Sequence, residues 1–489
     1  MTLPGTLFAK LWQRLAPMAG AILAGPWAGR GADEFDTLLE LFQNASQPDV
    51  PAEIDAYLKG KKIPFSASIA DLDQRALAVM CALDEAVMTI HPGFPRRLSG
   101  FGAAARPMLS AMRARRVAEG NYAEVKRVGL VIPKGNLRPR THSGDDENAS
   151  GTELGNQFEY LALVAPLPDG RTIRIIAPPP SRLLVPIDRS DQVGLAPIAE
   201  DREDLKFEVS NRGDRPYLDT LPRAAPLGAR MVEAVTHLLD DGAGLVVLPE
   251  LVAPVAAAED LSVALRGRSA KGHQALILAG TGPSKDHDPV VAKPYNEAVL
   301  MGADGRIFAR QRKLHLFNMS INRMRDCGIA PMKGFASRNH LEYAAAGSEI
   351  VICDFHGLGR VLVLICEDLE QPNPSEQLAR SLRPDWILTP VLDISQEVGR
   401  WTHTRAIDLS RRSGARVVVS CSATLGVRMA GGDQLANLGS NIVNSGLCVD
   451  MKADRRFKLV RATGALSPDR VTVTWDPAAW DKHELVTKK

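Results

Sequence analysis

The segment Val361-Leu362-Val363-Leu364-Ile365-Cys366-Glu367-Asp368 changes from apolar to charged within one residue. Its Val/Leu/Ile run predicts a strand buried on both faces of a sheet, and the charged residues mark the carboxyl end of that strand. A cysteine inside such a run is usually a core residue, which is our interpretation of Cys353, Cys421 and Cys448. Cys366 differs because two carboxylates follow it directly, so the pattern indicates a functional group at a strand end.

Two further strand ends carry groups that complement a thiol. Val246-Val247-Leu248-Pro249 is a strand-like run that ends in Glu250, and Gln311-Arg312 leads to Lys313. Ligands bind at the carboxyl ends of strands in α/β folds. Taken singly, Glu250 would be an ordinary surface acid and Lys313 a solvated neighbour of an arginine. Taken together, a carboxylate, an amine and a thiol at strand ends are expected to converge.

The chain around these segments alternates between strand and helix patterns, which predicts an α/β layered domain. Near-continuous apolar runs predict strands at residues 193–198, 244–249, 275–280, 349–355, 361–366, 386–390 and 416–421. Apolar residues at spacings of three and four predict helices at residues 229–239, 375–381 and 399–412.

These segments resemble the nitrilase, or carbon–nitrogen hydrolase, superfamily. Its signature is a Glu after a buried strand ending in Pro, a Lys inside an Arg-Lys-x-His-Leu string and a Cys inside an Ile-Cys-x-Asp string. All three occur here in that order, at Glu250, Lys313 and Cys366. The resemblance covers about residues 190–450. It implies a four-layer αββα sandwich, in a hydrolase domain at residues 185–480.

The resemblance also implies roles for the site residues. Glu250 is expected to take the proton of Cys366, since a free thiol is mostly protonated at neutral pH. Lys313 is expected to favour the thiolate and, with the backbone N–H of Glu367, to stabilise the tetrahedral intermediate. We assign the second glutamate of the family to Glu342, which precedes Tyr343-Ala344-Ala345-Ala346-Gly347, although Glu349 lies nearby. This chemistry requires no metal or other cofactor.

The predicted activity is hydrolysis of a non-peptide C–N bond in a small amide or nitrile-type substrate through a Cys thioester. One alternative is acyl or amido transfer, in which an amine captures the thioester. Another is a nitrilase-fold sensor or scaffold that acts with a protein partner, which an intact Glu–Lys–Cys set opposes. The resemblance further implies a homodimer or higher homo-oligomer in which the helical faces of two subunits pair.

Residues 1–180 match no family that we recognise. Apolar spacing predicts helices at residues 34–42 and 69–88, and two β-rich runs at residues 158–164 and 172–176 predict a β-hairpin. A polar loop at residues 138–156 and a proline-rich linker at residues 178–180 complete this region. We expect a mainly helical extension that supplies no catalytic group and could recruit a protein partner.

One departure from the family is an insertion at residues 318–339, between Lys313 and Cys366. It is expected to lie over the mouth of the active site as a lid or specificity loop.

Composition narrows the remaining function classes. Lys plus Arg total 59 and Asp plus Glu total 57, which gives no electrostatic case for binding nucleic acid or a membrane surface. No run approaches the roughly 18 apolar residues of a membrane-spanning helix. The six cysteines include no CxxC pair, so a cytoplasmic protein without disulfides is expected. Export is the alternative, because Lys10 and Arg14 precede an apolar run that loosely resembles a signal peptide.

Overall fold

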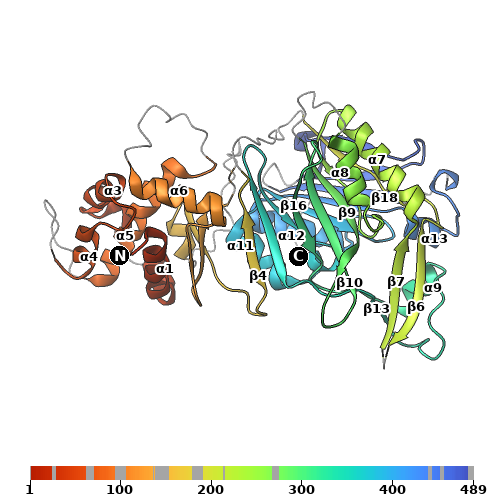
Figure 1. Cartoon of the computed structure of the whole chain (residues 1–489), viewed down its shortest axis with the longest axis horizontal. Coiled ribbons are helices and arrows are strands. Elements are labelled where there is room, and N and C mark those ends of the chain that lie inside the picture. Colours follow the sequence, from red (N-terminus) through yellow and green to blue (C-terminus); the bar gives the residue numbers. More distant parts are fainter. Residues whose placement is uncertain are drawn as a thin grey trace, which may run out of the picture. The chain divides into compact units, whose positions relative to one another are not determined.

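The computed structural model describes residues 2–24, 29–61, 71–93, 106–135, 137, 154–178, 191–212, 215–266, 275–438, 443–451 and 456–482 (Figure 1). Contacts divide the chain into two units, Met1–Pro179 with Arg380–Arg383, and Pro180–Ala379 with Pro384–Lys489. Most of the predicted polar loop at 138–156, and two of the three prolines of the predicted linker, lie outside the described residues.

Two stacked sheets form the centre of the second unit. The first has the strand order β11-β10-β9-β8-β5-β20, and the second contains the run β21-β19-β18-β17-β16-β15-β14. The first sheet consists of β5 (Gln192–Leu195), β8 (Ala243–Val247), β9 (Leu276–His287), β10 (Pro294–Gly302), β11 (Ile307–Arg312) and β20 (Val471–Thr474). The strands of the second run are β14 (Glu349–Phe355), β15 (Gly359–Val363), β16 (Trp386–Val391), β17 (Arg416–Cys421), β18 (Val443–Asp450), β19 (Arg456–Ala462) and β21 (Asp481–Lys482).

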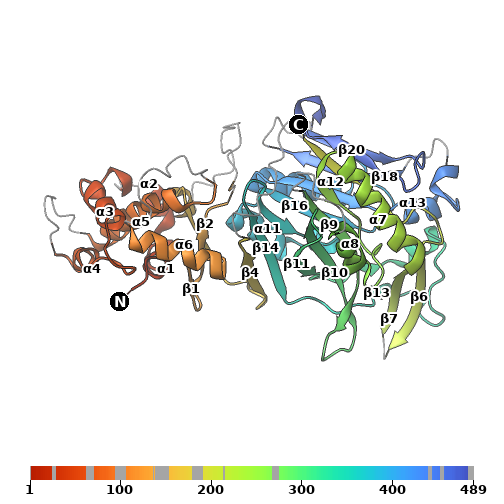
Figure 2. The same ribbon diagram turned by 45° about the horizontal axis from the view of Figure 1, so that its top comes forward.

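Helices cover the outer faces of both sheets (Figures 1 and 2). On the first sheet, α7 (Ala224–Asp240) and α8 (Ala257–Arg266) bury apolar residues against β8 and β9. On the second, α12 (Trp401–Ser413) packs on β17 and β18. The inner faces meet where β16 and β17 contact β8. The structure therefore confirms the predicted four-layer αββα sandwich.

The central strands of both sheets are parallel and buried. In the first sheet β5, β8 and β9 pair in parallel, and in the second β15, β16 and β17 do so. Every residue of β15 and β16 is buried, as expected for strands covered on both faces. β8 and β16 belong to different sheets, and the contact between these two strands where the sheets stack brings their carboxyl ends together.

A smaller side sheet contains the first strand of the predicted insertion at its edge. Its order is β12-β13-β7-β6, from β12 (Asn318–Met319), β13 (His340–Glu342), β7 (Arg215–Pro222) and β6 (Leu205–Arg212). The short helix α9 (Ile321–Asp326) follows β12. Buried residues of this part, among them Met319 and Met324, form an apolar cluster against Leu392 and Ile394 in the loop after β16. The insertion is thus an ordered element packed beside that loop.

The first unit is mainly helical, as predicted, and has its own core. Its helices include α1 (Pro4–Leu15), α2 (Ala19–Ala24), α3 (Phe35–Gln43), α4 (Ala52–Leu58), α5 (Leu72–Ala86) and α6 (Pro107–Glu119). Helix α5 is buried along most of its length and contacts α1, α3 and α4. The predicted helices at 34–42 and 69–88 correspond to α3 and α5.

The pairing predicted for the hairpin is wrong. The segment at residues 166–170 does turn, with the Gly170 N–H donating to Leu167 O at 3.1 Å. However, β3 (Leu161–Val164) pairs with β2 (Gly129–Pro133), which forms a hairpin with β1 (Ala123–Val125); β4 (Thr172–Ile176) is not part of this sheet. Gly129 allows the close approach of β3, because a Cβ there would lie 2.1 Å from Val164 O.

One buried carboxylate connects the helices of the first unit to its sheet. Asp84 on α5 accepts the backbone N–H groups of Glu159, Tyr160 and Leu161 at 2.7–2.9 Å. Arg30 donates to the same carboxylate at 2.7 Å. Burial raises the pKa of Asp84 to about 6, and the three N–H donors and Arg30 oppose that rise. At neutral pH Asp84 is therefore an ionised group with several buried partners.

Replacing Asp84 by Ala should destabilise the first unit strongly. The change leaves backbone N–H donors and the Arg30 guanidinium without their buried acceptor, which costs about 3–5 kcal/mol. The loss of free energy of unfolding is measured by urea unfolding. Hydrogen exchange of residues 72–86 shows whether the loss falls on α5. Glu119→Ala, which removes a partly exposed Arg115–Glu119 pair, is the matched control and should cost less than about 1 kcal/mol. Equal effects of the two changes would show that the Asp84 carboxylate does not stabilise the contact between α5 and the sheet.

Candidate active site

Cys366 lies at a sharp turn between β15 and the short helix α10 (Glu367–Glu370). Its N–H donates to Pro390 O at 3.0 Å, which extends the pairing of β15 with β16 past the end of the strand. Its φ is 47°, an unfavourable value for a side chain with a Cβ that costs about 1–3 kcal/mol. The turn thus holds the thiol at the edge of the sheet, where it is only 4% exposed.

Glu250 comes to the same place from the other sheet. It follows β8, and its N–H donates to the carbonyl oxygen of Val391, the last residue of β16, at 3.4 Å. Its Oε2 accepts the N–H of Leu392 at 2.9 Å. The carboxylate is 2% exposed. Contacts to the last residues of β16 and to the loop that begins at Leu392 therefore position both Glu250 and Cys366.

Lys313 joins the two glutamates. Its Nζ donates to Glu250 Oε1 at 2.7 Å and to Glu342 Oε2 at 2.6 Å, and its side chain is 1% exposed. Glu342, at the end of β13, also accepts the N–H of Phe317 at 3.0 Å. The structure thus brings Glu250, Lys313 and Glu342 together, with Cys366 close enough for its thiol to bond to Glu250. It places Glu342 rather than Glu349 on the lysine.

The charges of these groups set the protonation of the thiol. Burial raises the pKa of Glu250, and Lys313 opposes the rise. Burial would lower the pKa of Lys313, but Glu250 and Glu342 outweigh it and hold that pKa well above its usual value. Burial and the charge of Glu250 raise the pKa of Cys366 well above its usual value, against the opposing effect of Lys313. Lys313 therefore acts in the expected direction, toward the thiolate, but burial and the charge of Glu250 outweigh it.

Asn296 on β10 is a site residue that the sequence analysis missed. Its Nδ2 donates to Glu250 Oε1 at 2.9 Å and to Glu342 Oε1 at 2.8 Å, and its backbone carbonyl accepts the N–H of Lys313 at 2.8 Å. The residue is 1% exposed. The available signal was an amide inside an otherwise buried strand pattern. Asn296 spaces the two carboxylates around the ammonium.

Asp368 connects the loop of Lys313 to the turn of Cys366. Its carboxylate accepts the N–H of His315 at 2.8 Å and those of Leu314 and Ile365 at 3.1–3.3 Å. It is fully buried and two residues from the thiol. Glu367 begins α10, where the first N–H groups of a helix have no partner within the helix. These residues shape the turn around the thiol.

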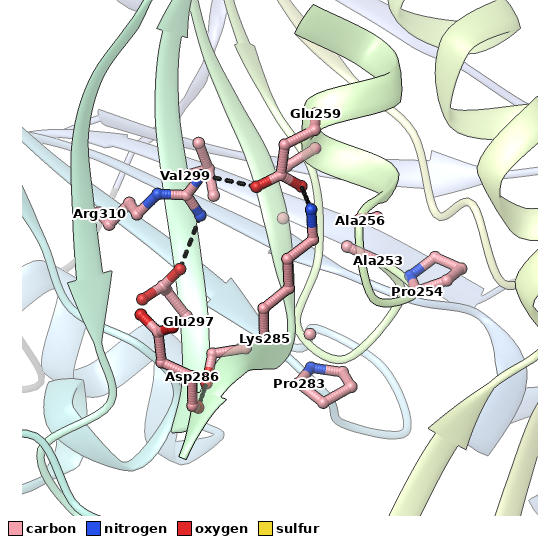
Figure 3. Close-up of a pocket in the computed structure, with 14 residues that line it drawn as sticks. Ala253, Pro254, Ala256, Glu259, Pro283, Lys285, Asp286, Glu297, Val299 and Arg310 are labelled. Atoms are coloured by element: carbon pink, nitrogen blue, oxygen red, sulfur yellow. Dashed lines mark hydrogen bonds and ion pairs between the residues drawn. The ribbon is translucent and has the colours of Figure 1, made fainter. Parts of the chain in front are cut away.

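A separate cavity of about 220 Å³ lies beside α8 on the outer side of the first sheet (Figure 3). Arg310 bridges Glu259 and Glu297 at 2.8 and 2.7 Å, and Lys285 lies 3.8 Å from Glu259. These charged groups neutralise one another, and the lining includes none of the predicted site residues. The candidate active site is therefore the cluster of Glu250, Lys313, Glu342 and Cys366. No group of His, Cys, Asp and Glu among the described residues is arranged to hold a metal ion.

Comparison with known proteins agrees with the resemblance seen in the sequence. Residues 219–381 match the family model of the carbon–nitrogen hydrolases, which confirms the resemblance for this part of the chain. The comparison with curated proteins gives no match. Similar solved structures include Saccharomyces cerevisiae Nit3, a member of branch 10 of the nitrilase superfamily, at 16% identity and a TM-score of 0.35, covering 60% of this chain and 92% of that one.

Two further structures show likeness of the same degree. A CN-hydrolase superfamily protein from Xanthomonas campestris has 16% identity and a TM-score of 0.33, with 59% of this chain and 91% of that chain covered. An amidase from Nesterenkonia sp. has 14% identity and a TM-score of 0.34, with 57% and 93% covered. In the described part of this chain, no helix is long and apolar enough to cross a membrane.

Replacing Asn296 by Leu should move the pH dependence of Cys366 alkylation to higher pH. The thiol reacts after Glu250 takes its proton, and the lost amide N–H had favoured the ionised form of Glu250. A loss of about 1.4 kcal/mol corresponds to about one pH unit. The measurement is the rate of iodoacetamide labelling at Cys366 against pH, by mass spectrometry.

Gln311→Leu is the control for Asn296→Leu. This substitution also removes a buried side-chain amide. The amide oxygen of Gln311 accepts the N–H of Val351 at 2.8 Å, outside the site. It should lower the melting temperature without moving the labelling midpoint. An unchanged midpoint in a folded Asn296→Leu protein would contradict a role for this amide in holding Glu250.

Proposed function

We propose that this chain is a carbon–nitrogen hydrolase that cleaves a small amide through a thioester on Cys366. The observation that carries the proposal is the buried Lys313 ammonium, held between Glu250 and Glu342 beside a thiol at a strained strand end. Burying such a set of charges is costly unless they are mutually paired, so its presence points to chemistry. The match of residues 219–381 to the carbon–nitrogen hydrolase family model also supports it.

The first half of the reaction forms the thioester. Glu250 takes the proton of Cys366 as Sγ attacks the carbonyl carbon of the amide, which gives a tetrahedral oxyanion. Lys313 and the Glu367 N–H stabilise that negative charge. The intermediate then collapses with cleavage of the C–N bond, and the proton held by Glu250 passes to the departing amine. The products are the acyl-enzyme and ammonia or an amine.

The second half releases the acid. Water attacks the thioester carbon while Glu250 takes one of its protons, and a second oxyanion forms in the same place. Collapse breaks the C–S bond, and the proton returns to the sulfur of Cys366. Acyl transfer differs only in that an amine replaces water.

The resting protonation of the site fits a base that acts at neutral pH. Burial raises the pKa of Glu250 toward the working range of a general base, since a base is most effective near the ambient pH. Lys313 keeps its proton, so the ammonium can serve the oxyanion throughout. In the proposed mechanism an ionised Glu250 takes the proton of a neutral thiol as Sγ attacks the substrate.

The site geometry does not support the alternative of a non-enzymatic sensor or scaffold. A binding module has no need for a buried ammonium that contacts two carboxylates at 2.6–2.7 Å next to a thiol. Self-association through the α12 side of the hydrolase unit stays a prediction, which light scattering at micromolar concentration tests. The recruitment of a protein partner by residues 1–180 also stays a prediction.

Cys366→Ala should abolish release of ammonia in a screen of small amides and nitriles. It removes the atom that bonds to the acyl group, and no acyl adduct should then appear in the intact mass. Cys353→Ala is the control, because Cys353 is equally buried in the neighbouring strand β14 but outside the site. Ammonia release by Cys366→Ala at a near-normal rate would exclude the thioester route.

A further inference from the structure

A second charged cluster begins one residue beyond the loop position that holds Glu250. Leu392 donates its N–H to Glu250, and the next residue is Asp393, whose side chain is 1% exposed. One residue of backbone spans at most about 3.6 Å, so this cluster lies beside the predicted reaction centre.

Two arginines from different elements meet at Asp393. Arg400, at the N-terminus of α12, donates from Nη2 to Asp393 Oδ1 at 2.9 Å. Arg323, on α9 beside the side sheet, also donates to Oδ1. The N–H of Ile394 reaches the same oxygen at 2.6 Å, and Trp401 Nε1 donates to Oδ2 at 3.0 Å. Both oxygens of the Asp393 carboxylate thus accept hydrogen bonds, and Oδ1 positions both guanidinium groups.

The charges of this cluster do not balance. Within the described part of the chain, Asp393 is the one acid that forms an ion pair with Arg323 or Arg400, so two positive charges face one negative charge. The Nε atoms of both arginines are buried and have no hydrogen-bond partner there. A partly buried excess of positive charge favours the binding of an anion.

The arginines are also accessible to a ligand. The side chains of Arg323 and Arg400 keep 21% and 29% of their surface exposed, whereas Asp393 keeps 1%. A guanidinium has five N–H donors in a planar fork that suits a carboxylate. One net positive charge matches one carboxylate, while a phosphate dianion would leave negative charge uncompensated.

We propose that Arg323 and Arg400 form the subsite for a carboxylate at the far end of the acyl chain. The substrate class is then an amide of an acid that carries a second, free carboxylate. Asp393 is a positioning residue that holds the two arginines. This inference rests on the proposed function, since it describes the substrate of the same site. It gives the insertion at residues 318–339 a role in specificity, because that segment supplies Arg323.

The test compares two amides of nearly equal shape, succinamate and 4-methylpentanamide, in which two methyl groups replace the carboxylate oxygens. The wild-type kcat/KM should favour succinamate, and glutaramate extends the comparison by one methylene. Arg323→Gln and Arg400→Gln should each lower kcat/KM for the anionic amide by about 10- to 100-fold, as expected for a lost charge-assisted hydrogen bond. Turnover of the neutral amide should change less than about twofold.

Arg325→Gln is the matched control. Arg325 lies on the same helix, but its side chain contacts Ala336 O on the exposed side. This variant should leave both amides unaffected. If Arg323→Gln lowers kcat/KM equally for both amides, Arg323 only holds α9 in place and the subsite is excluded. Unchanged kinetics in both arginine variants would also overturn it.

A second measurement separates this inference from the proposed function. Succinate should slow iodoacetamide labelling of Cys366 in the wild-type protein, and the protection should disappear in Arg323→Gln and Arg400→Gln. Protection without turnover of any amide would support the subsite and contradict the hydrolase proposal. Turnover of neutral amides without preference for succinamate and without protection would contradict the subsite while the hydrolase proposal stands.

Discussion

The contact between Lys313 and its two glutamates is the constraint on which the rest of the hydrolase unit depends. An ammonium that is 1% exposed is stable only if opposite charges lie within hydrogen-bonding distance, and Glu250 and Glu342 meet that need at 2.6–2.7 Å. Each partner comes from a different element. The first sheet supplies Glu250 and, just past β11, Lys313, while β13 of the side sheet supplies Glu342. Separating any of these elements would leave buried charge uncompensated.

The end of β16 and the loop that begins at Leu392 transmit that constraint to the thiol. Pro390 O binds the N–H of Cys366, Val391 O binds that of Glu250, and the Leu392 N–H binds the Glu250 carboxylate. The first two contacts are backbone to backbone and do not depend on side-chain identity, so the αββα stacking itself brings Glu250 and Cys366 to the same place. The side sheet packs its apolar cluster on the same loop. The proposed catalytic residues and the proposed carboxylate subsite therefore both contact one short segment.

The first unit follows a separate physical logic. Its core is formed by α5 and the helices around it, and its main polar tie is the Asp84 carboxylate, which receives backbone N–H groups from the sheet and a guanidinium from Arg30. The predicted site residues all belong to the other unit. The carbon–nitrogen hydrolase match likewise begins after the first unit, at residue 219. The first unit therefore supplies none of the predicted site residues. Its proposed role is to bind a protein partner.

The sequence by itself determined the strands β14 and β17 to the residue, the layered α/β class, and the positions of Glu250, Lys313 and Cys366, because strand ends and apolar runs are local patterns. Only the tertiary structure decided which strands pair, so it corrected the hairpin at residues 158–176. It also revealed the side sheet, Asn296 and the Arg323–Asp393–Arg400 cluster. The direction of the Cys366 pKa shift also emerged only there, since burial and the charge of Glu250 outweigh Lys313. Pairing and burial depend on residues far apart in the chain, and no local pattern encodes them.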